Sequence, residues 1–185
     1  WDFPHRGPRP EPGETPIPRN YQDNQETEIL KNGIFNFALD EDAREIYILD
    51  NGKRVIVYDM DNGEYKRGWG GRGKPLSEID NGPTPSYEWD GGPPPDMDGF
   101  APAVHCVMLS NDGLVYVCER GMNRIQVFTK AGQHVSEFMV APNTPARGPI
   151  CGRPGSDEWP MCGSTYNIAF SHDEEQKWVF IADGT

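Results

Sequence analysis

Three segments of this chain repeat one pattern, in which alternating apolar residues run into an acidic residue and a turn. The segments read IYILDNG from Ile46, VYVCERG from Val115 and VFIADGT from Val179. Alternation with a period of two is typical of β-strands, and the residues that follow are typical of turns. Because the same strand–turn unit recurs, the sequence predicts a repetitive all-β structure.

Each of these segments lies within a set of short apolar runs that predict further strands. Almost no helix is expected, because no stretch keeps a 3.6-residue apolar period over three turns. The repeats are 69 and 64 residues apart, against the about 40–45 residues typical of a four-stranded propeller blade. The excess lies in two inserts rich in glycine and proline, residues 70–102 and 141–163. The strands are predicted at 33–39, 46–50, 54–60 and 64–69, then at 103–109, 114–119, 124–129 and 133–139, then at 164–170 and 178–183.

Repeated antiparallel meanders with long connections are typical of a β-propeller, and a β-sandwich of similar strand count is the alternative. The recurring turn chemistry favours the propeller. About two and a half blades are present, and propellers close with about four to eight. We therefore expect a fragment that more chain, a further copy or a protein partner completes.

Charge and composition exclude several classes of function. The net charge is −12 and the pI is about 4.7, which argues against a nucleic-acid-binding protein. No apolar run approaches the about 18 residues that a membrane-spanning helix needs, so no membrane insertion is expected. Residues 1–32 are rich in proline and predict an extended N-terminal arm before a partial propeller over 33–185.

The second set of strands carries a family resemblance. Its run VHCVMLSNDGLVYVCERGMNRIQVFTKAG resembles an NHL repeat, and ALDEDAREIYILDNGKRVIVYD and AFSHDEEQKWVFIADGT are weaker or partial copies. More narrowly, the chain resembles bacterial six-bladed propellers grouped with the peptidyl-α-hydroxyglycine α-amidating lyases. Related propellers also serve as binding modules without catalysis, so the fold alone does not decide the function.

The four cysteines suggest two disulfides. A three-residue hairpin loop at residues 111–113, with Gly113 in the left-handed region, places Cys106 directly opposite Cys118 on one face. Cys151 and Cys162 lie within one insert, where a bridge would close a loop of about ten residues. The alternative is four reduced thiols. Two disulfides imply a secreted or periplasmic location.

The resemblance also implies a candidate site in the central channel. In the lyases, a histidine at the position of His105 is one of three that bind zinc, and an arginine at the position of Arg120 assists the chemistry. Zinc would polarise the carbinol oxygen of an α-hydroxyglycine substrate. Phe35 and Tyr166 occupy the other visible histidine positions, so only one ligand is assigned. The alternatives are a histidine held by hydrogen bonds or water, and an ion pair of Arg120 with Glu119 or another carboxylate.

Two acidic segments raise the question of calcium. Residues 59–63 (DMDNG) resemble half of an EF-hand loop, but the glycine arrives one position early, so a hairpin turn is the better interpretation. Asp96 and Asp98 have the oxygen ligands that a cation prefers, although a solvated loop is the simpler expectation. Zinc and calcium are thus the two cofactor candidates, and the sequence establishes neither.

Two hypotheses of different classes follow. The preferred one is an extracytoplasmic propeller that binds a protein or another ligand, because its loops carry aromatic residues that offer contact surface. The alternative is a zinc-dependent amidating lyase with His105 and Arg120 in the channel. The predicted binding surface consists of Trp69, Tyr87, Trp89, Trp159 and Tyr166.

Overall fold

The computed structural model describes residues 34–50, 53–80, 87–101, 104–147, 151 and 162–184. The predicted arm at 1–32 and Trp159 lie outside the described residues. Within these ranges the chain forms strands joined by turns, with three short 3-10 turns and no longer helix. None of the described residues belongs to a helix of the length and apolarity that crossing a membrane requires.

The strands form two four-stranded antiparallel sheets and one two-stranded hairpin, each in simple sequence order. Every predicted strand is confirmed to within one residue at its ends, apart from the start of the strand predicted at 164–170. That strand begins at residue 167, because the backbone N–H of Ser164 bonds to the side chain of Asn123 and not to a sheet partner. The sheets comprise β1 (Ile34–Asp40), β2 (Glu45–Asp50), β3 (Arg54–Asp59) and β4 (Tyr65–Gly70); β5 (Val104–Leu109), β6 (Leu114–Glu119), β7 (Arg124–Thr129) and β8 (His134–Met139); and β9 (Asn167–Phe170) with β10 (Val179–Ala182).

Successive sheets pack face to face because each central strand alternates its side chains between two faces. Tyr47 and Leu49 of β2 share a buried cluster with Val107 and Val117 of the second sheet. Ile48 of β2 lies on the opposite face, in a second cluster that the short turn η2 (Leu76–Glu78) covers. One face of the first sheet therefore builds the core that it shares with the second.

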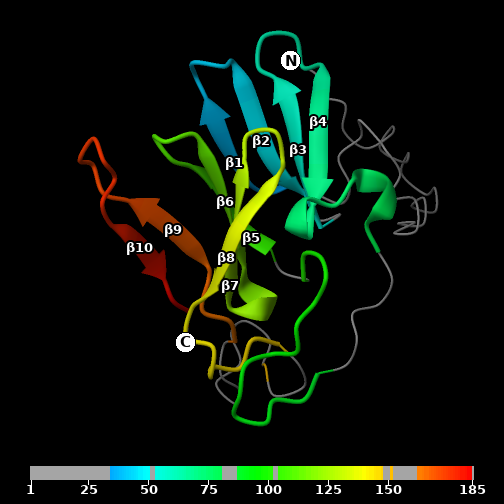
Figure 1. Cartoon of the computed structure of the whole chain (residues 1–185), viewed down its shortest axis with the longest axis vertical. Helices are drawn as coiled ribbons and strands as arrows, with labels where there is room; N and C mark the ends of the chain where they lie inside the picture. Colours follow the sequence, from blue (N-terminus) through cyan, green and yellow to red (C-terminus); the bar gives the residue numbers. More distant parts are fainter. Residues whose placement is uncertain are drawn as a thin grey trace, which may run out of the picture.

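The second sheet repeats this arrangement toward the hairpin. Cys106, Cys118 and Ile125 form a third cluster with Ile168 of β9. The first strands of the three sheets are neighbours, since β1 contacts β5 and β5 contacts β9. Figure 1 shows the sheets following one another from the blue-cyan sheet through the green-yellow sheet to the orange-red hairpin. This is a partial β-propeller with two full blades and the first two strands of a third.

Both ends of this stack carry exposed apolar side chains. On the first sheet, Phe37 is 55% exposed and pairs with Ile48, so it lies on the face turned away from the second sheet. On the hairpin, Trp178 and Phe180 are 62% and 61% exposed. Each side chain lies where a neighbouring blade would pack in a longer propeller, which agrees with the expectation that something completes the ring.

Two predicted surface aromatics are instead buried, so for them the prediction was wrong. Trp69 is only 2% exposed, because β4 directs it into the core between the sheets, where its ring centre lies 5.9 Å from that of Phe128. Tyr87 is 5% exposed and lies beneath the guanidinium of Arg147, 5.1 Å from its ring centre. Trp89 is half-buried. The inserts thus fold onto the blades and onto each other, which their composition does not reveal.

Candidate functional site

The candidate site lies where the first strands of two blades begin. His105 is the second residue of β5, Arg120 begins the short turn η3 (Arg120–Met122) after β6, and Tyr166 directly precedes β9. The ring of His105 lies 5.0 Å from that of Tyr166 and 6.0 Å from that of Phe35, centre to centre. The structure therefore brings together all four residues that the sequence placed at the mouth of the channel.

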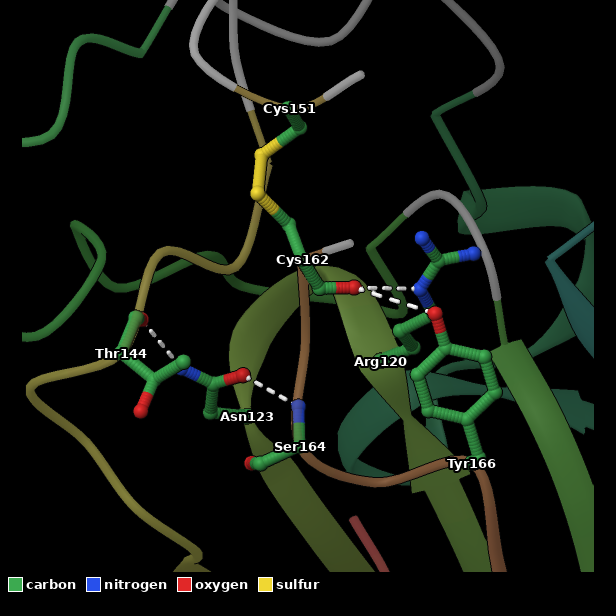
Figure 2. Close-up of a disulfide and its surroundings, with 7 residues drawn as sticks. All are labelled: Arg120, Asn123, Thr144, Cys151, Cys162, Ser164 and Tyr166. Carbon is green, nitrogen blue, oxygen red and sulfur yellow. Dashed lines mark hydrogen bonds between the residues drawn. A yellow bond between two sulfur atoms is a disulfide. The ribbon is translucent and has the colours of Figure 1, made fainter. Parts of the chain in front are cut away.

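Arg120 is held from two sides. Its Nε donates a hydrogen bond of 2.6 Å to the carbonyl oxygen of Cys162, and its guanidinium carbon lies 4.6 Å from the centre of the Tyr166 ring. A cation over an aromatic face gains about 0.5–2 kcal/mol. The Tyr166 hydroxyl approaches the same carbonyl at 3.5 Å. In Figure 2 the two terminal nitrogens of Arg120 point away from both neighbours.

The predicted disulfides are present. Cys106 bonds to Cys118 with the predicted register across β5 and β6, and their Cα atoms are 4.8 Å apart. Cys151 bonds to Cys162 with Cα atoms 5.4 Å apart. Because Cys162 supplies the carbonyl that holds Arg120, the second disulfide ties the candidate site to the insert, as Figure 2 shows.

Asn123 is a positioning residue that the sequence reasoning missed. It ends η3 in the left-handed region with φ of 52°, which asparagine tolerates better than most residues. Its Nδ2 donates to the carbonyl of Thr144 at 2.7 Å, and its Oδ1 accepts the backbone N–H of Ser164 at 2.9 Å. One side chain thus fastens both ends of the second insert to the turn that carries Arg120 (Figure 2). An asparagine directly after such a turn was the available signal.

Gly163 is a second residue that the sequence reasoning missed. Its φ is 90°, and a Cβ at this position would lie 2.3 Å from Cγ of Arg120 and 2.6 Å from its carbonyl oxygen. Both the backbone conformation and the lack of space demand glycine here. The close approach of this backbone to Arg120 fixes where the guanidinium lies.

The expected ion pair between Arg120 and Glu119 does not form. Glu119 is fully buried and faces the other way along the strand end, where Arg124 donates to it through Nε at 2.6 Å and Gln126 through Nε2 at 2.8 Å. The backbone N–H of Ala101 completes the set. Burial raises the pKa of Glu119, and these hydrogen bonds oppose that rise. Within the described ranges, no carboxylate forms an ion pair with Arg120.

Among the described residues, His105 is not part of a zinc site. The described residues contain no group of three histidine, cysteine, aspartate or glutamate side chains that could hold a metal. Burial, and then the charge of Arg120, hold the pKa of His105 below its usual range. A neutral imidazole beside a guanidinium and two aromatic rings offers a metal one nitrogen and a repelling cation, so these residues do not fit zinc.

The acidic segments are occupied by the protein's own groups. Asp59 accepts the backbone N–H groups of Asp61 and Asn62 in the predicted hairpin turn. Asp96 receives hydrogen bonds from Arg72 and Arg124, and Lys74 forms an ion pair with Asp98. Arg44 pairs with Asp61 in the first segment. Carboxylate oxygens already held by backbone N–H groups or cationic side chains are poor calcium ligands, so neither segment fits calcium.

Comparison with known proteins yields only distant structural likenesses. No known protein family and no curated protein matches the chain in sequence. Saccharomyces cerevisiae Sqt1 is 8% identical with a TM-score of 0.43, over 78% of this chain and 25% of Sqt1. Citrobacter koseri AztD is 17% identical with a TM-score of 0.39, over 62% of this chain and 25% of AztD. Virginiamycin B lyase from Staphylococcus aureus is 18% identical with a TM-score of 0.36, over 74% of this chain and 33% of the lyase. The chain spans a third or less of these proteins, and the fold assignment rests on the strand order and the core.

Proposed function

We propose that this chain is part of an extracytoplasmic β-propeller that binds a partner by a carboxylate group at Arg120. The observation that carries the proposal is how that guanidinium is bonded and oriented. Its Nε is bonded to Cys162 and its face is stacked on Tyr166, while its terminal nitrogens point away from both. A guanidinium held in place in this way is ready for the bidentate hydrogen bonds that a carboxylate accepts.

The surroundings of Arg120 favour an aromatic or apolar group next to that carboxylate. Phe35 is 46% exposed, and its ring lies beside that of His105. The lowered pKa of His105 keeps its imidazole neutral at pH 7, so it presents an uncharged ring to a ligand. A protein or peptide partner with an aromatic residue next to the residue that bears its free C-terminal carboxylate matches this combination.

Two disulfides support the extracytoplasmic part of the proposal, since such bonds persist in oxidising compartments. The NHL assignment within the propellers remains a prediction. We do not extend the proposal to an amidating lyase, because His105 has no second metal ligand near it among the described residues.

The proposal is tested with a matched pair of small probes. Acetyl-glycyl-phenylalanyl-glycine with a free carboxylate is titrated into the full chain by calorimetry, beside the same tripeptide as its amide. We expect Arg120→Gln to weaken binding of the acid by about tenfold, the effect of losing a charged hydrogen-bonding group, and to leave the amide unaffected. Arg44→Gln is the control, because Arg44 pairs with Asp61 on an exposed turn. Equal affinity for the acid and the amide would contradict the proposal. Equal losses of affinity for the acid in Arg120→Gln and Arg44→Gln would also contradict it.

A further inference from the structure

A groove at the opposite end of β5 and β6 from Arg120 has the chemistry of a second binding site. It lies between the turn that joins β5 to β6 and the turn that joins β9 to β10, and its volume is about 450 Å³. Volumes of this size are common for sites that bind small ligands. Figure 1 shows the two turns next to each other at the same end of the molecule.

The two turns are fixed to each other. The side-chain carbonyl of Gln176 accepts the backbone N–H of Asn111 at 2.6 Å, and Nδ2 of Asn111 donates to the carbonyl of Glu174 at 3.1 Å. These two bonds, both donated by Asn111, join two neighbouring blades across the groove. Its walls are therefore held at a set distance, as a preformed site requires.

The floor of the groove is aromatic. Tyr116 of β6 and Phe170 of β9 meet edge to face with ring centres 5.0 Å apart, and Val179 of β10 adds an apolar wall. Tyr116 and Phe170 are both only partly buried, so their rings are accessible to a ligand. Such a floor accommodates a methylene chain and attracts a cation to the face of the tyrosine.

The rim of the groove is acidic. Asp112, Glu174 and Glu175 line it and are all exposed. The ion pairs of the described residues involve other carboxylates, such as Asp40 with Lys130. The charge of Asp112 adds to burial in raising the pKa of the Tyr116 hydroxyl, so that charge is felt on the floor. Asp112 accepts a hydrogen bond from the Ser110 hydroxyl, but none of the three carboxylates forms an ion pair within the described residues. Three such carboxylates over an aromatic floor complement a positive charge on an apolar stem.

We propose that this groove binds a lysine or arginine side chain of a basic peptide segment. The methylene stem lies on Phe170 and Val179, and the charged end lies over the ring of Tyr116, among Asp112, Glu174 and Glu175. The net charge of −12 steers a basic partner toward the protein. The site is separate from Arg120, so its failure would leave the carboxylate proposal untouched.

The test measures binding of a fluorescein-labelled tetralysine peptide to the full chain by anisotropy, with labelled tetraglutamine as the uncharged probe. We expect tetralysine alone to bind, and Glu174→Gln/Glu175→Gln to weaken that binding by about fivefold. The control variant Glu64→Gln/Glu88→Gln removes the same charge at exposed positions outside the groove. We expect it to change the affinity by less than about twofold.

A second pair of variants tests the aromatic floor. Tyr116→Leu should weaken tetralysine binding by about threefold, while Tyr116→Phe retains it, because the π face and not the hydroxyl contacts the cation. Equal losses in the groove and control charge variants would overturn the proposal, since binding would then follow net charge alone. Tighter binding of spermidine than of tetralysine would also overturn it, by identifying a polyamine and not a peptide as the ligand.

Discussion

The first and second sheets share an ion pair at equivalent positions, but they differ in the turn beside it. That difference in the turn creates the candidate site. In each sheet, a carboxylate that ends the second strand pairs with an arginine that begins the third. Asp50 and Arg54 form the first pair and Glu119 and Arg124 the second, with three of the four fully buried and Arg124 1% exposed. The turn of the second pair is one residue longer and forms η3, which begins with Arg120. The shared pair stabilises each sheet, and the longer turn of the second sheet positions Arg120 at the candidate site.

The second pair also has a wider role than holding its own sheet together. Arg124 donates to the carbonyl oxygens of Met97 and Gly99 and to the carboxylate of Asp96. Arg72, from the same insert, bonds to Glu137 of β8. The buried arginine of the second sheet thus anchors the first insert, which lies against that sheet.

Removing the arginine from either pair is expected to have the largest effect on the free energy of unfolding. Arg124→Met leaves the carboxylate of Glu119 buried without its cation, which should lower the free energy of unfolding by about 3–5 kcal/mol. Arg54→Met should lower the free energy of unfolding by a similar amount. Urea unfolding measures both.

Limited proteolysis then separates the two arginine variants under native conditions. Only Arg124→Met should become cleavable within residues 87–101, because Arg124 bonds to Met97 and Gly99 of that segment. Cleavage there in both variants, or in neither, would break the comparison between the two sheets.

Acid should weaken the first sheet at Glu45. The hydrogen bond from Arg67 lowers the pKa of Glu45 to about 2, from 4.5. A carboxylate with a lowered pKa contributes stability above pH 4.5 that is lost as the pH falls toward 2, here up to about 3 kcal/mol. The raised pKa of Glu119 acts in the opposite direction. Thermal unfolding measured from pH 6 to pH 2.5 should show this loss of stability, and Arg67→Met should abolish most of it. A pH profile of stability that is unchanged in Arg67→Met would contradict the assignment of the loss to Glu45 and Arg67.

Gly163→Ala should have a smaller effect on stability and a large effect on the site. The left-handed backbone and the contact with Arg120 predict a cost of about 1–3 kcal/mol and a displaced guanidinium. Gly63→Ala is the matched control, since Gly63 has φ of 75° but nothing within 4 Å of an added Cβ. Only the first variant should lose binding of the tripeptide acid, and a loss in both would show that general destabilisation is responsible.

The smallest expected effect is on the titration of His105. Burial and the charge of Arg120 both lower its pKa, so the wild-type imidazole should titrate below 6.5. Arg120→Gln removes the second cause, and the pKa should rise while staying below the usual value. Proton NMR of the histidine ring measures both; an unchanged pKa would show that Arg120 is too far away or too well solvated to act on it.

The sequence predicted the features that depend on residues close together in the chain. Alternation and turn residues located the strands, and the hairpin at Gly113 set the register that places Cys106 opposite Cys118. It did not predict that Glu119 would pair with Arg124 and not with Arg120, or that Trp69 would be buried. Those outcomes depend on packing between blades and on where an insert returns, and no local pattern encodes either.

The most direct test of the central claim is a nitrogen-15 NMR titration of the full chain with acetyl-glycyl-phenylalanyl-glycine as the free acid. We predict shift changes concentrated at Arg120, Gly163, Tyr166 and His105, including the arginine side-chain resonance, and none of comparable size with the amide. Changes spread over other surfaces, or no change at Arg120, would contradict the claim that this end of the propeller binds a carboxylate.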